Sequence, residues 1–164
     1  VAETRIDIGE AADAGKEFLA RHGFGEMKAV GYDAYNNVAS IMYARTVDGV
    51  TIYPDKTTVK VALDDGEILG LSAAELLRSG PRREIGRPAM SEEQAREYLN
   101  PNFRVEEASP ALILNDMEEE VLCYEFTGKI NGSDYRIFIN AENGSEEKVE
   151  TIKPAEAAFG QERS

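Results

Sequence analysis

The chain carries the same turn signals twice, which indicates two copies of one structural unit. Each half has two hairpin dipeptides: Asp48-Gly49 and Asp65-Gly66, then Asn131-Gly132 and Asn143-Gly144. Such dipeptides tolerate the positive φ angles of tight β-hairpins. Gly132 lies 83 residues after Gly49 and Gly144 lies 78 residues after Gly66, so the first copy has five extra residues, near residues 52–56. This repeat predicts a duplicated module.

A short amphipathic helix is predicted ahead of the strands in each half. Residues 10–23 place four apolar side chains on one side: Ala11, Ala14, Phe18 and Leu19. Residues 91–99 do the same with three: Ala95, Tyr98 and Leu99. In that second segment Ser91 and Gln94 have the spacing of a capping box, and Pro101 stops the helix. Each copy therefore begins with a helix that has one apolar face.

Alternating apolar residues after each helix predict strands that bury one face. One set is Val59, Val61 and Leu63, and the matching set in the second copy is Tyr135, Ile137 and Ile139. We therefore expect an α+β chain of two tandem modules, each with a helix packed on a small antiparallel sheet. The expected boundaries are 1–78 for the first module, 79–88 for a linker, 89–155 for the second module and 156–164 for a flexible tail.

The charge balance disfavours two classes of partner. With a net charge of -13 and a pI near 4.5, most of the surface repels nucleic acid and anionic lipid head groups. A basic protein partner is electrostatically easier, although the acidity could serve solubility alone. Arg82 and Arg83, in the predicted linker, are candidate partner-binding residues that could dock a carboxylate or bridge the modules. The alternative interpretation of these arginines is a solvated linker.

Residue types that support catalysis are scarce. His22 is the single histidine and stands at a predicted helix end, which favours a capping role. Cys123 is the single cysteine, so neither an intramolecular disulfide nor a cysteine-based zinc site can form, and its strand context favours packing. We predict no catalytic residue, cofactor or metal site, and hence no enzyme. An acidic glycan hydrolase that acts through a carboxylate pair is the less favoured alternative.

The extra residues of the first copy supply the remaining candidate site. Tyr53, Pro54 and Asp55 place an aromatic residue beside a proline, and such a residue makes a contact of low entropic cost if it is exposed. We take all three as candidate partner-binding residues. The alternative is that Tyr53 covers the sheet, or that Tyr53-Pro54 blunts a sheet edge.

Several strings in the chain resemble a known family. They are IYPDKTTVKVALDDGEILGL from residue 52, LNPNFRVEEASPALIL from residue 99, and EVLCYEFTGKINGSDYRIFINAENGSEEKVETI from residue 120. Over about residues 26–153 the chain is similar to PepSY repeats, specifically to the C-terminal region of YpeB-type spore germination proteins. The helix and two-hairpin layout agrees with that fold.

The resemblance implies a non-catalytic binding or scaffolding module. Such a module would stabilise, localise or inhibit a cortex-lytic peptidoglycan hydrolase during sporulation and germination. It implies an extracytoplasmic place in the endospore envelope, on the cortex side of the inner membrane, with an anchor segment absent from this sequence. No apolar run here reaches the roughly 20 residues that span a bilayer, so we expect no membrane contact by this fragment itself. The alternative function is a structural or self-association module of the envelope.

Overall fold

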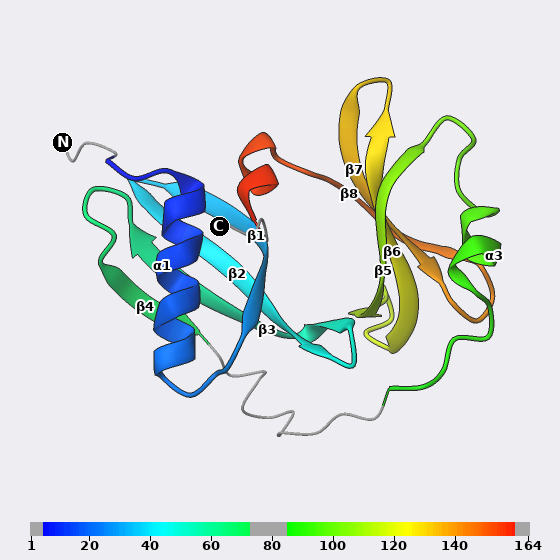
Figure 1. Ribbon diagram of the computed structural model, residues 1–164, viewed down its shortest axis with the longest axis horizontal. Coiled ribbons are helices and arrows are strands. Elements are labelled where there is room, and N and C mark those ends of the chain that lie inside the picture. Colours follow the sequence, from blue (N-terminus) through cyan, green and yellow to red (C-terminus); the bar gives the residue numbers. More distant parts are fainter. Residues whose placement is uncertain (1–4, 73–84, 160–164) are drawn as a thin grey trace. The chain divides into compact units, whose positions relative to one another are not determined.

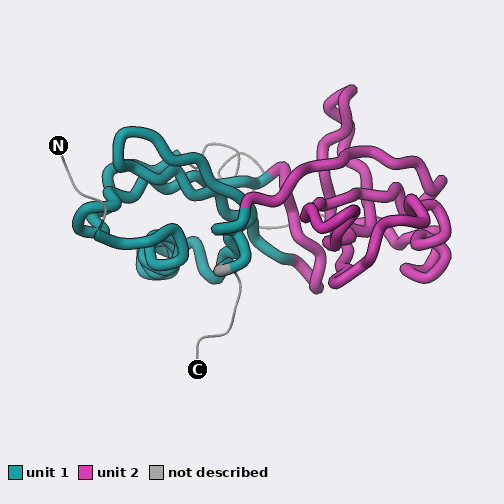
Figure 2. The backbone as a smooth tube through the Cα atoms, turned by 90° about the horizontal axis from the view of Figure 1, so that it is seen from above, with its two compact units in different colours: residues 1–46, 55–80, 154–164 teal, residues 47–54, 81–153 magenta. Residues whose placement is uncertain are grey.

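The computed structural model describes residues 5–72 and 85–159. The chain divides into two compact units, which Figure 2 shows in different colours. Unit 1 comprises residues 1–46, 55–80 and 154–164, and unit 2 comprises residues 47–54 and 81–153. Each unit holds a helix and antiparallel strands, so the predicted α+β class is confirmed.

Unit 1 begins with the helix α1, Ile8–Arg21. Asp7 is its N-cap, because the Asp7 carboxylate accepts a hydrogen bond from the Glu10 amide at 2.7 Å. The Glu10 carboxylate in turn accepts one from the Asp7 amide at 3.1 Å, which completes a capping box. His22 is the C-cap, as predicted, and its amide donates to the carbonyls of Phe18 and Leu19.

The sheet of unit 1 has four strands. They are β1, Met27–Tyr35, β2, Val38–Val47, β3, Val50–Ala62, and β4, Ile68–Ser72, hydrogen-bonded in the order β1-β2-β3-β4. The dipeptide Asp48-Gly49 forms the β2–β3 turn with φ angles of 50° and 82°, as the sequence predicts. The helix α1 lies along one face of this sheet (Figure 1).

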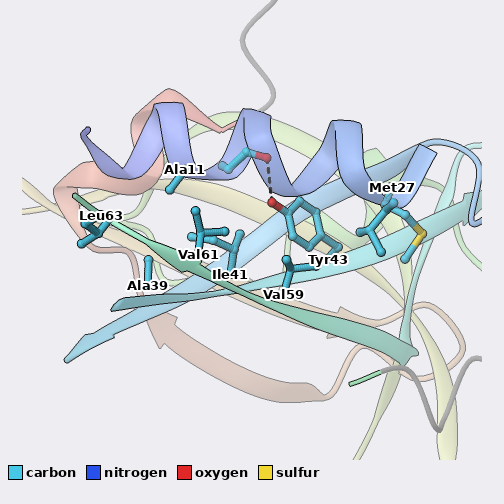
Figure 3. Packing of buried hydrophobic residues seen from close by; sticks show 10 residues of the cluster. Ala11, Met27, Ala39, Ile41, Tyr43, Val59, Val61 and Leu63 are labelled. Atoms are coloured by element: carbon cyan, nitrogen blue, oxygen red, sulfur yellow. Dashed lines mark hydrogen bonds between the residues drawn. The ribbon is translucent and has the colours of Figure 1, made fainter. Parts of the chain in front are cut away.

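The core of unit 1 lies between α1 and that face (Figure 3). Its largest buried side chain is Tyr43 of β2, whose hydroxyl donates a hydrogen bond to the Ala12 carbonyl at 2.6 Å. A Cβ at Gly15 would overlap the Tyr43 hydroxyl, so glycine at position 15 lets the helix approach the ring. The buried remainder is aliphatic, and includes Leu19, Ile41, Val59 and Val61.

Unit 2 repeats this arrangement. Its helix α3, Glu92–Arg96, precedes β5, Arg104–Leu114, β6, Glu120–Ile130, β7, Ser133–Asn140, and β8, Glu146–Thr151. The capping box of Ser91 and Gln94 is present as predicted. The α-helix is shorter than predicted, because the amides of Tyr98 and Leu99 bond three residues back, which tightens the last turn before Pro101. The core of unit 2 includes the buried residues Ala95, Phe103, Phe126, Ile137 and Ile139.

The five extra residues of the first copy have a structural counterpart. The corresponding strands are β3 and β7, which are 13 and 8 residues long. The start of β3 therefore has no equivalent in β7, and residues 50–54 belong to unit 2. There Thr51 pairs with Ala111 and Ile52 with Leu112, in parallel to β5. Turn signals are local and could not predict this parallel pair.

The predicted module boundaries stay a prediction. Residues 79–84 of the proposed linker lie outside the described residues. At the other end of the chain, the sequence suggests a flexible tail from residue 156, whereas the structure has a 3-10 helix η1, Pro154–Ala158. The Phe159 ring meets Tyr32 edge-on at 6.1 Å and packs against the unit 1 core. Burial of the apolar Phe159 ring against this core stabilises the position of the segment that carries it.

Candidate partner-binding surfaces

Tyr53 makes internal contacts within unit 2. It is half-buried on β3, and its ring meets Phe138 of β7 edge-on, with centroids 5.5 Å apart. Its hydroxyl donates a hydrogen bond to Glu125 Oε1 at 2.5 Å. Burial and the nearby Glu125 carboxylate raise the pKa of Tyr53 well above its ordinary value, so the phenol stays protonated. This geometry matches the interpretation in which Tyr53 covers the sheet.

Glu125 is the centre of a charged network on that face of the sheet. It is a buried carboxylate of β6, 5% exposed, and its Oε2 lies 3.3 Å from Arg136 Nε of β7. Arg136 also contacts Glu150 of β8, at 3.2 Å. Burying an ionised group is costly unless it is paired and hydrogen-bonded, and here both conditions are met. The network thus links β3, β6, β7 and β8.

Asp55 forms a comparable buried ion pair in unit 1. Its carboxylate is fully buried, and Oδ2 lies 2.7 Å from both Nε and Nη2 of Arg45 on β2. Pro54 stands between the two anchored residues and is the last residue of β3 in unit 2. The neighbours Tyr53 and Asp55 are therefore each anchored in a different unit. Partner binding by these three residues stays a prediction, and Arg82 and Arg83 lie outside the described residues.

Unit 2 contains a cleft that the sequence did not predict. It has a volume of about 480 Å³ and is lined by residues 86–89, Leu112, residues 120–122 and residues 140–142. Its wall at residues 86–89 is attached at Ala89, because the amides of Ala89 and Met90 both donate to the Ala141 carbonyl. The Tyr124 hydroxyl adds a bond to the Met90 carbonyl at 2.9 Å. These bonds hold the end of that wall at Ala89 in place.

The lining of the cleft combines apolar groups with two acidic residues, Glu120 and Glu142, and one basic residue, Arg87. Leu112 and Ala141 are buried in it, whereas Glu142 is exposed at its side. A smaller, mostly apolar pocket of about 160 Å³ shares Leu122 and Ala141 with it and extends to Val50 and Pro110. Apolar concavities with a few polar groups are where ligands and peptide side chains commonly bind. No single position in the sequence signals this cleft, because four separate segments form it.

The sheets also present edge strands. Among the described strands, β4 pairs only with β3, and β8 pairs only with β7. The edge strand β4 carries two exposed apolar side chains, Leu69 at 52% and Leu71 at 42%. An edge strand of this kind can receive an extended segment of another chain.

Cys123 and His22, the residue types most often found in catalytic sites, take part in packing and helix capping here. Burial, together with the nearby Glu147 carboxylate, raises the pKa of the Cys123 thiol to about 12, so the reactive thiolate is disfavoured. His22 caps α1, and its ring lies against that of Phe18 in a tilted arrangement with centroids 4.2 Å apart. Within residues 5–72 and 85–159, no group of three or more His, Cys, Asp or Glu side chains is arranged to hold a metal ion. The helices in those ranges also include none long and apolar enough to cross a membrane.

Two family models together match most of the chain. Residues 1–86 match the model described as "YpeB sporulation, PepSY1 and PepSY2 domains". Residues 89–150 match the model described as "Peptidase propeptide and YPEB domain". The first match ends within the predicted linker, and the second begins directly after it.

Curated proteins and a solved structure give the same result. The chain is 42% identical over 159 residues to a sporulation protein YpeB of Halalkalibacterium halodurans, and 38% identical over 161 residues to that of Bacillus subtilis. Each match covers 97% of this chain and 36% of the relative, so the chain spans about a third of their length. The Bacillus megaterium YpeB C-terminal domain superposes with a TM-score of 0.88 at 40% identity, over 93% of this chain and 68% of that one.

Proposed function

This chain belongs to the YpeB sporulation protein family, and we propose that it is a non-catalytic binding module for a cortex-lytic peptidoglycan hydrolase of the spore. Membership of the family supports a role in sporulation or germination. In our proposal the module stabilises, localises or inhibits the hydrolase. It does so in the extracytoplasmic spore envelope, attached through a part of the protein outside this sequence.

One observation carries this proposal: the buried side chains that could take part in a reaction are engaged in contacts within the protein. Tyr53 donates a hydrogen bond to Glu125, Glu125 forms an ion pair with Arg136, and burial raises the pKa of the Cys123 thiol to about 12. Polar groups that stabilise the fold in this way favour a role in recognition over one in catalysis. The description of the second matched model, a peptidase propeptide domain, supports a module that accompanies a hydrolase.

We propose the cleft of unit 2 as the surface that receives the partner. Its wall, attached at Ala89, and its apolar lining suit one or two apolar side chains of an extended protein segment. In its lining the acidic Glu120 and Glu142 outnumber the basic Arg87, and the chain has a net charge of -13, which favours a segment that also carries basic residues.

The direct test is a binding experiment with a purified cortex-lytic hydrolase. We expect the fragment to capture the hydrolase and to reduce its activity or its rate of proteolysis. Glu142→Lys, in the cleft, should weaken binding by about 1 kcal/mol or more, roughly fivefold. The matched control is Glu93→Lys on α3, an exposed charge reversal outside the cleft lining. No capture by the unmodified fragment would refute the proposed function, and equal binding by both variants would move the partner away from the cleft.

Self-association is a second candidate because β4 exposes Leu69 and Leu71 at a sheet edge. Sedimentation over a range of concentrations measures it, and a Leu71→Lys variant should remove it if β4 is the contact. Incubation of the fragment with purified cortex tests the enzymatic alternative. Release of muropeptides by the fragment alone would replace the binding proposal with a hydrolase.

A further inference from the structure

Two identical tripeptides, Asn-Gly-Ser, occur at residues 131–133 and 143–145. In an Asn-Gly pair the glycine backbone nitrogen can attack the side-chain amide carbon of the asparagine, because glycine has no Cβ to hinder the approach. Since the tripeptides are identical, a difference in this reaction between the two places comes mainly from the fold around them.

The first tripeptide is open to this reaction. The two-residue turn between β6 and β7 consists of Asn131 and Gly132, whose φ angles are 50° and 82°. The strands β6 and β7 are labelled in Figure 1. Both residues are exposed, and a Cβ built on Gly132 would meet no heavy atom within 4 Å. Across residues 5–72 and 85–159, no hydrogen bond engages the Asn131 side chain or the Gly132 amide. No hydrogen bond therefore keeps the Asn131 side-chain amide away from the Gly132 backbone nitrogen.

The second tripeptide is restrained, because its central residue Gly144 is buried and two hydrogen bonds engage it. The Gly144 amide donates to the Asn140 carbonyl at 2.9 Å, and the Asn143 side-chain oxygen accepts from the Ser145 amide at 2.8 Å. The ring of Tyr98 covers Gly144 so closely that a Cβ there would lie 2.5 Å from ring atoms. Reaction at Asn143 would require both hydrogen bonds to break and the amide to turn under the ring.

We propose that Asn131 is a site of spontaneous deamidation in the folded protein and that the fold protects Asn143. The Gly132 nitrogen forms a bond to Cγ of Asn131. The bond from Cγ to Nδ2 breaks, and Nδ2 leaves as ammonia with the proton from the Gly132 nitrogen. Water then opens the cyclic imide at either carbonyl and yields aspartate or isoaspartate. Water is the only co-reactant, and nothing is oxidised or reduced.

Both products change the end of the β6–β7 hairpin. Each places a new carboxylate in the turn, beside the ion pair of Lys129 with Asp134, whose Nζ and Oδ1 lie 2.6 Å apart. The isoaspartate product also routes the main chain through Cβ. The added backbone atom is incompatible with the two-residue turn that sets the pairing of Ile130 with Ser133. Modification therefore alters the central hairpin of unit 2 at its turn.

The test is peptide mapping by mass spectrometry after the folded chain is incubated in mildly alkaline buffer. We expect Asn131 to convert about tenfold faster than Asn143, since breaking one hydrogen bond alone slows a reaction by about that factor. The same chain unfolded in urea is the control, and there the two sites should react at similar rates. Equal rates in the folded chain, or faster conversion at Asn143, would overturn the proposal.

Two variants sharpen the result. Asn131→Gln removes the fast product and leaves the slow one, which identifies the peptide. Tyr98→Ala uncovers Gly144 and should raise the rate at Asn143 toward that at Asn131. If the Tyr98→Ala chain fails to fold, the comparison of folded with unfolded unmodified chain still decides the proposal.

Discussion

The hydroxyl of Tyr53 and the carboxylate of Glu125 are hydrogen-bonded although 72 residues separate them in the sequence. Tyr53 belongs to the part of β3 that extends beyond its counterpart β7, and Glu125 lies on β6 of the second copy. The bond thus joins the extension of the first copy to the sheet of the second, and it is buried enough for its loss to be measurable.

Tyr53→Phe should lower the free energy of unfolding by about 1 to 3 kcal/mol, because Glu125 loses a donor in a buried place. Urea unfolding followed by circular dichroism measures this change. The control is Tyr35→Phe, in which an exposed tyrosine, 79% accessible, loses the same atom. If the two variants have equal midpoints, the Tyr53 hydrogen bond contributes nothing to stability.

Breaking the ion pair of Asp55 with Arg45 should cost more. Asp55→Asn leaves the Arg45 guanidinium, 15% exposed, without its carboxylate, and the expected loss is about 3 kcal/mol. Glu17→Gln removes an exposed pair with Arg21 on α1 and should cost less than about 0.5 kcal/mol. Thermal or urea unfolding compares them, and a loss below that of Glu17→Gln would show that the buried pair is not stabilising.

Gly15→Ala should destabilise unit 1 by about 2 kcal/mol, although alanine favours helices, because its Cβ overlaps the Tyr43 hydroxyl. A double-mutant cycle with Tyr43→Phe tests the cause. The alanine should cost less when it is combined with Tyr43→Phe, because that substitution removes the nearest clashing atom. Additive losses would place the strain elsewhere. Gly86→Ala is the control, since its Cβ would meet nothing within 4 Å.

Cys123 should make stability depend on alkaline pH. Its pKa is raised from 9.0 to about 12 in the folded state, so the protonated thiol is the form that the fold favours. The corresponding stability is complete below pH 9 and declines as pH rises from there toward 12, because the unfolded chain ionises first. Urea midpoints across this range should fall less steeply for Cys123→Ala than for the unmodified chain.

The same burial should protect the thiol from reaction. A thiol-selective reagent at neutral pH should label Cys123 only after unfolding, since the thiolate is the reactive form. Rapid labelling of the folded chain would contradict the buried placement of Cys123. Cys123→Ala gives the background rate.

The sequence alone determined the local features of this protein. The duplicated turns, the Ser91 capping box and the helix end at His22 are set by residues within a few positions of one another, and the structure contains all of them. The five extra residues of the first copy were also visible, because they displace one pair of glycines relative to the other.

Only the tertiary structure decided what those extra residues do. The parallel pairing of Ile52 with Leu112, the bond from Tyr53 to Glu125 and the cleft beside Glu142 each join segments far apart in the chain. Turn and cap preferences act over a few residues through backbone angles and local hydrogen bonds. Which strand lies beside an extended one depends instead on burial summed over the whole unit, and single positions in the sequence do not carry that information.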